Sequence, residues 1–173
     1  MSLVPSPDKC LELLKKAGCS DDVVKHCKAV RDVALKIAKR TDADVKLVEA
    51  GALLHDIGRS KTHDIFHAME GVKIAQKLGL PQSIINIIER HIGAGISKDE
   101  AKKLGLPPKD YIPKTLEEKI VCHADNLIDK YERQNIEDAT ERALDEGHKE
   151  YAERLLKLHK ELSDICGIDL NLL

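Results

Sequence analysis

Aromatic residues are almost absent from this sequence of 173 residues, which contains one Phe, three Tyr and no Trp. The core must therefore be built mainly from Leu, Ile, Val and Ala, and these residues, together with abundant Lys and Glu, favour helices. Long apolar runs are also missing. No segment approaches the length needed to cross a membrane, so the sequence predicts no membrane contact.

The sequence lacks a Cys-x-x-Cys pair among its five cysteines, and it shows no signal peptide. An odd number of cysteines without a secretory signal argues against a disulfide framework, so we expect reduced cysteines and a cytoplasmic location. The formal net charge is only −2. Such a charge offers no general attraction to nucleic acids, and a phosphorylated ligand would need a local binding site.

Helical patterns follow one another along the chain, and no alternating strand pattern is convincing. Ser20 is suited to cap one helix, and Gly18 to end the helix before it. Expected helices cover about residues 8–17, 44–57, 116–132, 136–147 and 149–165, and others carry His26 to Ile37, His67 to Leu78 and Ile84 to His91. Residues 97–113 are expected to be irregular apart from a short Lys-rich turn.

These patterns predict an all-α fold, with a single compact helical domain over residues 1–173. The polar residues of interest lie in a core of about residues 22–130. A C-terminal helical extension at about 136–166 carries an apolar stripe. We expect that stripe to pack on the core, with contact to a second copy in a homodimer as the alternative.

Five polar residues interrupt the apolar helical stripes: His26, the pair His55-Asp56, His91 and Asp125. A buried imidazole or carboxylate is costly unless it is paired, and a metal ion pairs several such groups at once. Adjacent helical residues lie about 100° apart, so His55 and Asp56 can both reach one ion. With His26 and Asp125, they predict a site for Mn, Fe, Co, Ni or Zn.

His67 and His91 indicate a second ion. They lie on consecutive expected helices joined by a Gly-Leu-Pro turn, and the two oxygens of Asp56 would allow it to bridge both ions. Taken singly, a helical histidine is more often a packed or surface residue than a ligand. The joint placement of these residues on apolar faces favours the metal interpretation.

The order His26, His55-Asp56, Asp125 resembles the HD superfamily of metal-dependent phosphohydrolases, over roughly residues 22–130. The block His-Asp-Ile-Gly at 55–58 is similar to that of the HDIG subgroup. The resemblance implies that His26, His55, Asp56 and Asp125 are metal ligands. His67 and His91 match the histidines of members with a second ion.

This sequence departs from many two-ion members at one position, because Ile92 stands where they carry a polar ligand. His63 and Glu70 are the nearest substitutes. We expect His123 to be structural, because it lies two residues before Asp125 and so on a different helix face.

The resemblance implies hydrolysis of a phosphate ester or phosphoanhydride, in a nucleotide or a related small molecule, by metal-activated water. Asp56 and Arg59 would be the catalytic residues. Arg59 either binds the substrate phosphate or is a solvated residue that the helix dipole favours. Two alternatives remain open: a di-iron oxygenase with a similar ligand set, and a non-catalytic sensor that binds a nucleotide.

Overall fold

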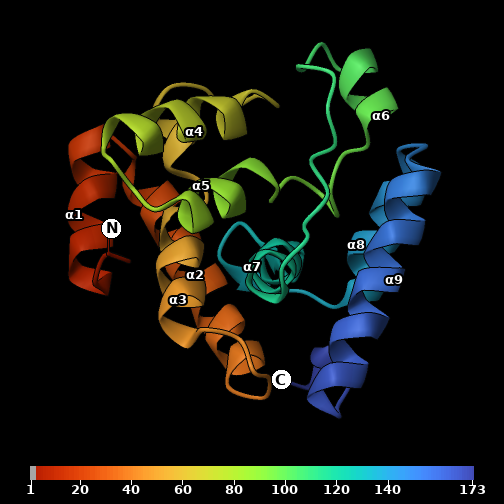
Figure 1. Cartoon of the computed structure of the whole chain (residues 1–173). Coiled ribbons are helices and arrows are strands. Elements are labelled where there is room, and N and C mark those ends of the chain that lie inside the picture. Colours follow the sequence, from red (N-terminus) through yellow and green to blue (C-terminus); the bar gives the residue numbers. More distant parts are fainter. Residues whose placement is uncertain (1–2) are drawn as a thin grey trace.

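The computed structural model describes residues 3–173. The helices in chain order are α1 (Pro7–Ala17), α2 (Asp21–Ala38), α3 (Val45–Leu54), α4 (His67–Lys77), α5 (Gln82–Glu89), α6 (Lys98–Lys103), α7 (Leu116–Asn126), α8 (Ile136–Asp145) and α9 (Lys149–Cys166). Helices α2, α3, α5 and α9 pack against α7, which is seen end-on near the middle of Figure 1. Two 3-10 turns and a small hairpin complete the fold: η1 (Ile57–Ser60), η2 (Leu170–Leu172), β1 (Ile128–Asp129) and β2 (Glu132–Arg133). The predicted all-α class is confirmed.

The helix boundaries follow local capping signals at several positions. The Ser20 side chain accepts a hydrogen bond from the Val23 N–H at the start of α2, and Gly18 ends α1 with a left-handed φ of 93°. Both features agree with the sequence prediction. Ser97 and Glu100 form a reciprocal capping box that stabilises the start of the short helix α6.

Helix α3 lies between two apolar clusters. Val48 and Ala52 belong to a cluster shared with α2, α7 and α9. Leu53 and Leu54 belong to a second cluster shared with α1 and α5, which includes Leu14. A helix buried from both sides is apolar nearly all round, as the sequence predicted. The C-terminal end of α3 is therefore held firmly in the interior.

Several expected helices end earlier than predicted, among them the one expected to reach His91, which ends at Glu89. The helix expected to reach Ile57 ends at Leu54, and the helix expected to reach Glu132 ends at Asn126. In the second case the chain forms the β1–β2 hairpin, in which Ile128 pairs with Arg133. The residues that directly follow Leu54 and Asn126 are also buried, so the helical periodicity of apolar residues continues past these two helix ends. Periodicity alone therefore could not locate these ends.

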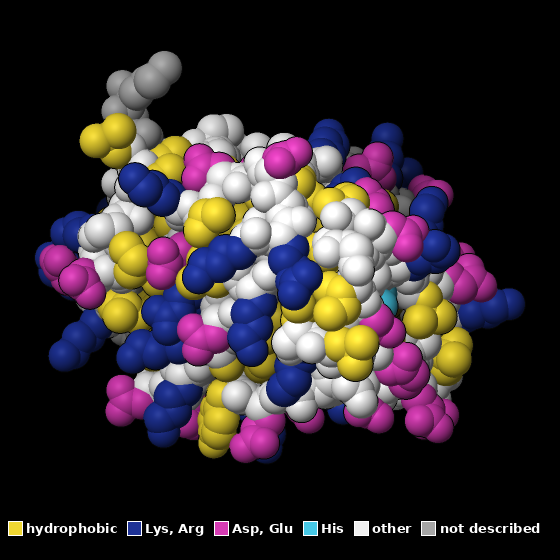
Figure 2. Space-filling view, turned by 90° about the horizontal axis from the view of Figure 1, so that it is seen from below, with side chains coloured by type: hydrophobic (Ala, Val, Ile, Leu, Met, Phe, Trp, Pro, Cys, Tyr) yellow, Lys and Arg dark blue, Asp and Glu magenta, His cyan; other side chains and the backbone are white. Residues whose placement is uncertain are grey.

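The surface mixes charges of both signs. Figure 2 shows Lys, Arg, Asp and Glu side chains interspersed over one face, with hydrophobic side chains scattered between them and very little histidine surface. Five of the eight histidines are instead buried: His55, His67, His91, His123 and His159. Within residues 3–173, no helix combines the length and apolar character needed to cross a membrane.

Gly58 allows η1 and α4 to approach closely. A Cβ atom on Gly58 would lie 1.7 Å from the His67 carbonyl oxygen and 2.5 Å from the Gly71 backbone nitrogen. Glycine is required here by this contact and not by a left-handed turn, because the φ of Gly58 is not positive. For the helix expected over residues 44–57, Gly58 would be the C-terminal stop, but the structure places it inside η1 at the contact with α4.

We predict that Gly58→Ala lowers the free energy of unfolding by about 3 kcal/mol, because α4 must move away from η1 to make room. Chemical denaturation measures this loss. Gly51→Ala is the matched control, since its new Cβ would meet the end of the Ile87 side chain at 2.6 Å, and a side chain can turn aside. Equal stability losses in the two variants would contradict the prediction.

Candidate metal centre

Three helices direct their C-terminal ends to one region of the interior. His55 is the residue that ends α3, His91 lies just beyond the end of α5, and Asp125 lies in the last turn of α7. His26 reaches the same region from α2, and His67 from the first residue of α4. Helix C-termini carry partial negative charge, so their convergence favours a cation.

The six predicted ligands meet in two clusters. Both clusters include His55, and each faces a different carboxylate oxygen of Asp56. In the first cluster, the ligand atoms of His26, His55 and Asp125 lie within 4.8 Å of one another. His26 Nε2 is 3.0 Å from Asp125 Oδ1 and 3.4 Å from Asp56 Oδ2. His55 Nε2 is 3.6 Å from each of those two carboxylate oxygens.

The second cluster surrounds the other oxygen of Asp56. His55, Asp56 and His91 have ligand atoms within 4.8 Å of one another. Asp56 Oδ1 lies 3.2 Å from His67 Nε2 and 3.2 Å from His91 Nε2, and the two Nε2 atoms are 3.0 Å apart. Asp56 thus presents one oxygen to each cluster, as a bridging carboxylate would.

Backbone carbonyls orient all four imidazoles. The Nδ1–H groups of His55, His67 and His91 donate to the carbonyl three residues earlier, at 2.6, 2.7 and 2.6 Å. His26 Nδ1 donates to the carbonyl of Lys130, far along the chain. A carbonyl can only accept, so each ring places its proton on Nδ1 and turns Nε2 toward the centre. This is the outer-shell arrangement that orients histidine ligands.

The polar atoms at the centre fit a divalent metal ion. His55 Nε2 and Asp56 Oδ1 are buried without a hydrogen-bond partner among residues 3–173. The Nε2 atoms of His67 and His91 face each other across 3.0 Å, which requires a proton or a cation between them. Imidazole nitrogens combined with carboxylate oxygens suit Mn, Fe, Co, Ni or Zn.

Charge on Asp56 is stabilised despite its burial. Burial alone would raise the pKa of Asp56, but His55, His67 and His91 together hold that pKa well below its usual range. Burial would lower the pKa of His55, and the Asp56 carboxylate outweighs it, so that this pKa lies well above its ordinary value. His55 and Asp56 therefore favour each other's charged forms.

Arg59 contacts Asp56 directly, a role that neither sequence-based alternative included. Its Nε donates to Asp56 Oδ2 at 2.9 Å, and its Nη1 donates to the His63 carbonyl at 3.2 Å. The Arg59 side chain is 30% exposed, so it also faces solvent. Arg59 therefore joins a buried carboxylate to the surface of the site.

The remaining histidines and acids lie elsewhere. His123 Nε2 is 2.8 Å from His159 Nδ1, and His159 Nε2 is 2.8 Å from Asp169 Oδ1. Burial lowers the pKa of His123 to about 3, so this ring is neutral, in keeping with the structural role expected for it. Glu70, a suggested substitute ligand, instead pairs with Lys73 at 2.8 Å on the surface.

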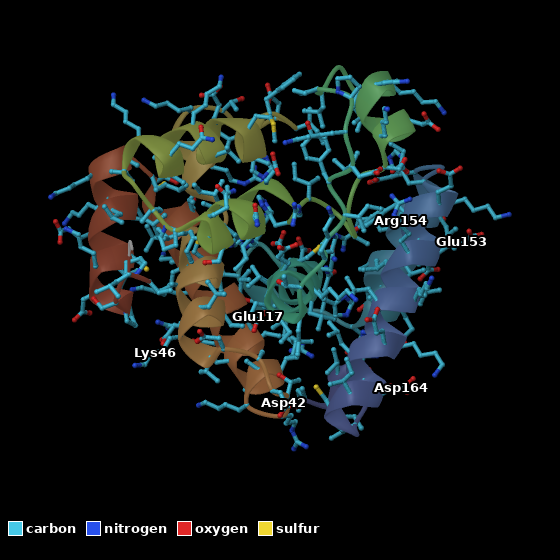
Figure 3. The ribbon with its side chains drawn as sticks, in the orientation of Figure 1. Asp42, Lys46, Glu117, Glu153, Arg154 and Asp164 are labelled. Atoms are coloured by element: carbon cyan, nitrogen blue, oxygen red, sulfur yellow. The ribbon has the colours of Figure 1, made fainter. Side chains whose placement is uncertain are left out.

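The loop that follows His91 is fixed to α7 and α9. The Asn126 amide donates to the Gly93 carbonyl at 2.8 Å, and Arg154 donates to the Gly95 carbonyl at 3.0 Å and to Glu100 at 2.9 Å. In Figure 3, Arg154 points from α9 toward α6, whereas its neighbour Glu153 points outward. These contacts limit movement of the chain next to His91.

An open pocket of about 630 Å³ leads to the first cluster. Its size lies within the range of small-molecule sites. The lining residues are Ser20, Asp22, Val23, His26, Asp56, Arg59, His63, Lys130 and Tyr131. Sequence reasoning missed Lys130 and Tyr131 as pocket residues, because the turn that carries them lay inside the helix expected over residues 116–132.

Comparison with known proteins relates residues 23–130 to one family. The HD domain model matches residues 23–130. A tRNA (cytidine(56)-2'-O)-methyltransferase of Thermoplasma volcanium is 46% identical over 171 residues, or 99% of this chain and 51% of that protein. The chain therefore spans about half the length of that relative.

Two further matches are similar in length to this chain. An uncharacterized protein of Methanocaldococcus jannaschii is 48% identical over 166 residues, which cover 91% of this chain and 97% of that protein. The crystal structure of the L. monocytogenes phosphodiesterase PgpH HD domain in complex with cyclic-di-AMP has a TM-score of 0.59 at 19% identity, covering 92% of this chain and 94% of that one. At this identity the likeness shows the fold. Given the match over residues 23–130 and the shared fold, this chain belongs to the HD domain family.

Proposed function

We propose that this chain is a metal-dependent phosphohydrolase that cleaves a phosphate ester or phosphoanhydride of a nucleotide or a related small molecule. One observation carries the proposal: two His/Asp clusters flank the buried Asp56, next to an open pocket that also holds Arg59 and Lys130. Cations beside a polar pocket are suited to hold a phosphoryl group.

The ligand set divides between two ions. His26, His55, Asp56 and Asp125 would hold the first ion, and His67 and His91, with Asp56 shared, would hold the second. Divalent ions in such a site lower the pKa of water and polarise phosphoryl oxygens. His26 and Asp125 have side chains that are 17% and 23% exposed, so the first cluster is the one that a substrate would reach from the pocket.

The residues of this chain would act mainly by holding charge in place. Asp56 is kept ionised by its histidine neighbours, and Arg59 donates to the same carboxylate. With its second contact only to the His63 carbonyl, the Arg59 guanidinium retains free N–H groups for a phosphoryl oxygen. Such fixed donors stabilise charge that develops in the transition state.

Relatives support the reaction class. The HD domain whose fold matches this chain is a phosphodiesterase domain, and it was crystallised with cyclic-di-AMP. The motif His55-Asp56-Ile57-Gly58 supports membership of the HDIG subgroup. The methyltransferase named for the Thermoplasma relative is about twice as long as the matched region, so its named activity need not reside in that region.

We predict that Asp56→Ala removes both ions and lowers turnover on the order of a hundredfold or more, because each ion loses a shared ligand. Elemental analysis of the purified variant measures the ions directly. His67→Ala should remove only the second ion. His148→Ala is the control, since the His148 side chain is 61% exposed and lies outside both clusters. Full metal content in Asp56→Ala would refute the ligand assignment.

We predict hydrolysis of phosphate esters or anhydrides that is lost on chelation and restored by one of the ions Mn, Fe, Co, Ni or Zn. A panel of nucleotides and simple phosphate esters, assayed with and without oxygen, tests this. Equal rates without oxygen agree with hydrolysis. Turnover that requires iron and oxygen would support the oxygenase alternative, and binding without turnover would support the sensor.

A further inference from the structure

We propose that Tyr131 forms the wall of a nucleobase site beside the metal centre, so that the preferred phosphate esters are those that carry a planar base. This inference rests on the proposed function and specifies its substrate class. Tyr131 lines the same pocket as His26, Asp56 and Arg59. Its ring therefore lies beside the place where a phosphoryl group would be held.

Tyr131 is the tyrosine that the fold leaves free. The chain has three tyrosines. Tyr111 is 2% exposed and donates its hydroxyl to the Pro107 carbonyl, and Tyr151 donates to the Asn126 side chain. Tyr131 is 48% exposed and forms no side-chain hydrogen bond within residues 3–173. In a protein with so few aromatic residues, one exposed ring in the pocket is available for a ligand.

The turn that carries Tyr131 is tied to the metal centre. Lys130 is the one non-glycine residue within 3–173 with a positive φ, 58°, and its carbonyl accepts the Nδ1–H of His26. A left-handed lysine is strained, and such strain persists where surrounding contacts fix the chain. The hydrogen bond to His26 is such a contact. Because Lys130 directly precedes Tyr131, this bond also fixes the position of Tyr131 relative to His26.

The charges around the ring suit a nucleotide. Lys25 Nζ lies 5.9 Å from the centroid of the Tyr131 ring, over one face, and Tyr131 is 48% exposed, so it also offers surface to a stacked base. Lys130 forms no ion pair with any residue of 3–173, and Arg59 lines the same pocket. A nucleotide with its base stacked on Tyr131 and its phosphate toward Arg59 and Lys130 would make both the stacking contact and the ionic contacts.

The test compares two ligands that share a phosphate and differ in the base. Calorimetry with the metal-loaded protein measures the affinities of the non-hydrolysable phosphonate analogues of adenosine 5′-monophosphate and ribose 5-phosphate, so that turnover does not consume the ligand. We expect a preference for the nucleotide on the order of tenfold, the size of one base–aromatic stacking contact. Tyr131→Ala should abolish this preference, and Tyr131→Phe should retain it. Metal content is measured for each variant.

Two further variants sharpen the comparison. Leu104→Ala truncates a side chain of similar exposure, 45%, outside the pocket, and it should retain the preference. Lys130→Gly keeps the left-handed turn but removes a cation, so it should weaken both ligands alike. The measured quantity is the ratio of the two affinities. A general loss of binding in Tyr131→Ala would lower both affinities and leave this ratio unchanged.

A wild-type protein with no preference, or a Tyr131→Ala variant that keeps it, would overturn the inference. Its failure is distinguishable from failure of the proposed function. If phosphate esters are hydrolysed but the base makes no difference, only the nucleobase site is refuted. If the base preference depends on Tyr131 but no ester is hydrolysed, the binding site stands and the hydrolase proposal falls.

Discussion

The site depends on the buried charge of one carboxylate. Asp56 is 2% exposed, and an ionised carboxylate is costly to bury unless it is paired. Four histidines and Arg59 come within 3.6 Å of its oxygens, from α2, α4, η1 and the ends of α3 and α5. Stabilising the charge of Asp56 therefore requires that these elements, which make up most of the N-terminal half of the fold, are correctly placed relative to one another.

Close packing sets that placement. Gly58 brings η1 against the first turn of α4, which carries His67, and a side chain at that position would separate them. The loop after His91 is held by α7 and α9. Helix α9 thus contributes to the site indirectly, because it fixes the chain next to His91 and contains none of the six candidate ligands.

The two clusters differ in access. His55, Asp56 and His91 are buried, whereas His26 and Asp125 are partly exposed at the pocket. The β1–β2 hairpin lies on the exposed side, where the Lys130 carbonyl orients His26 and Tyr131 lines the pocket. The interior thus concentrates the histidine and carboxylate groups, and the surface supplies the cations and the aromatic ring suited to a ligand.

The sequence by itself determined the helical class, several helix starts and the six candidate ligands that meet at the centre. It also determined the orientation of His55, His67 and His91, because each donates to a carbonyl only three residues away. Only the tertiary structure decided the orientation of His26, whose carbonyl partner is 104 residues distant, and the contact of Arg59 with Asp56. Local hydrogen bonds follow from spacing along the chain. Contacts between distant segments follow from how the helices pack, and neither residue type nor periodicity encodes that packing directly.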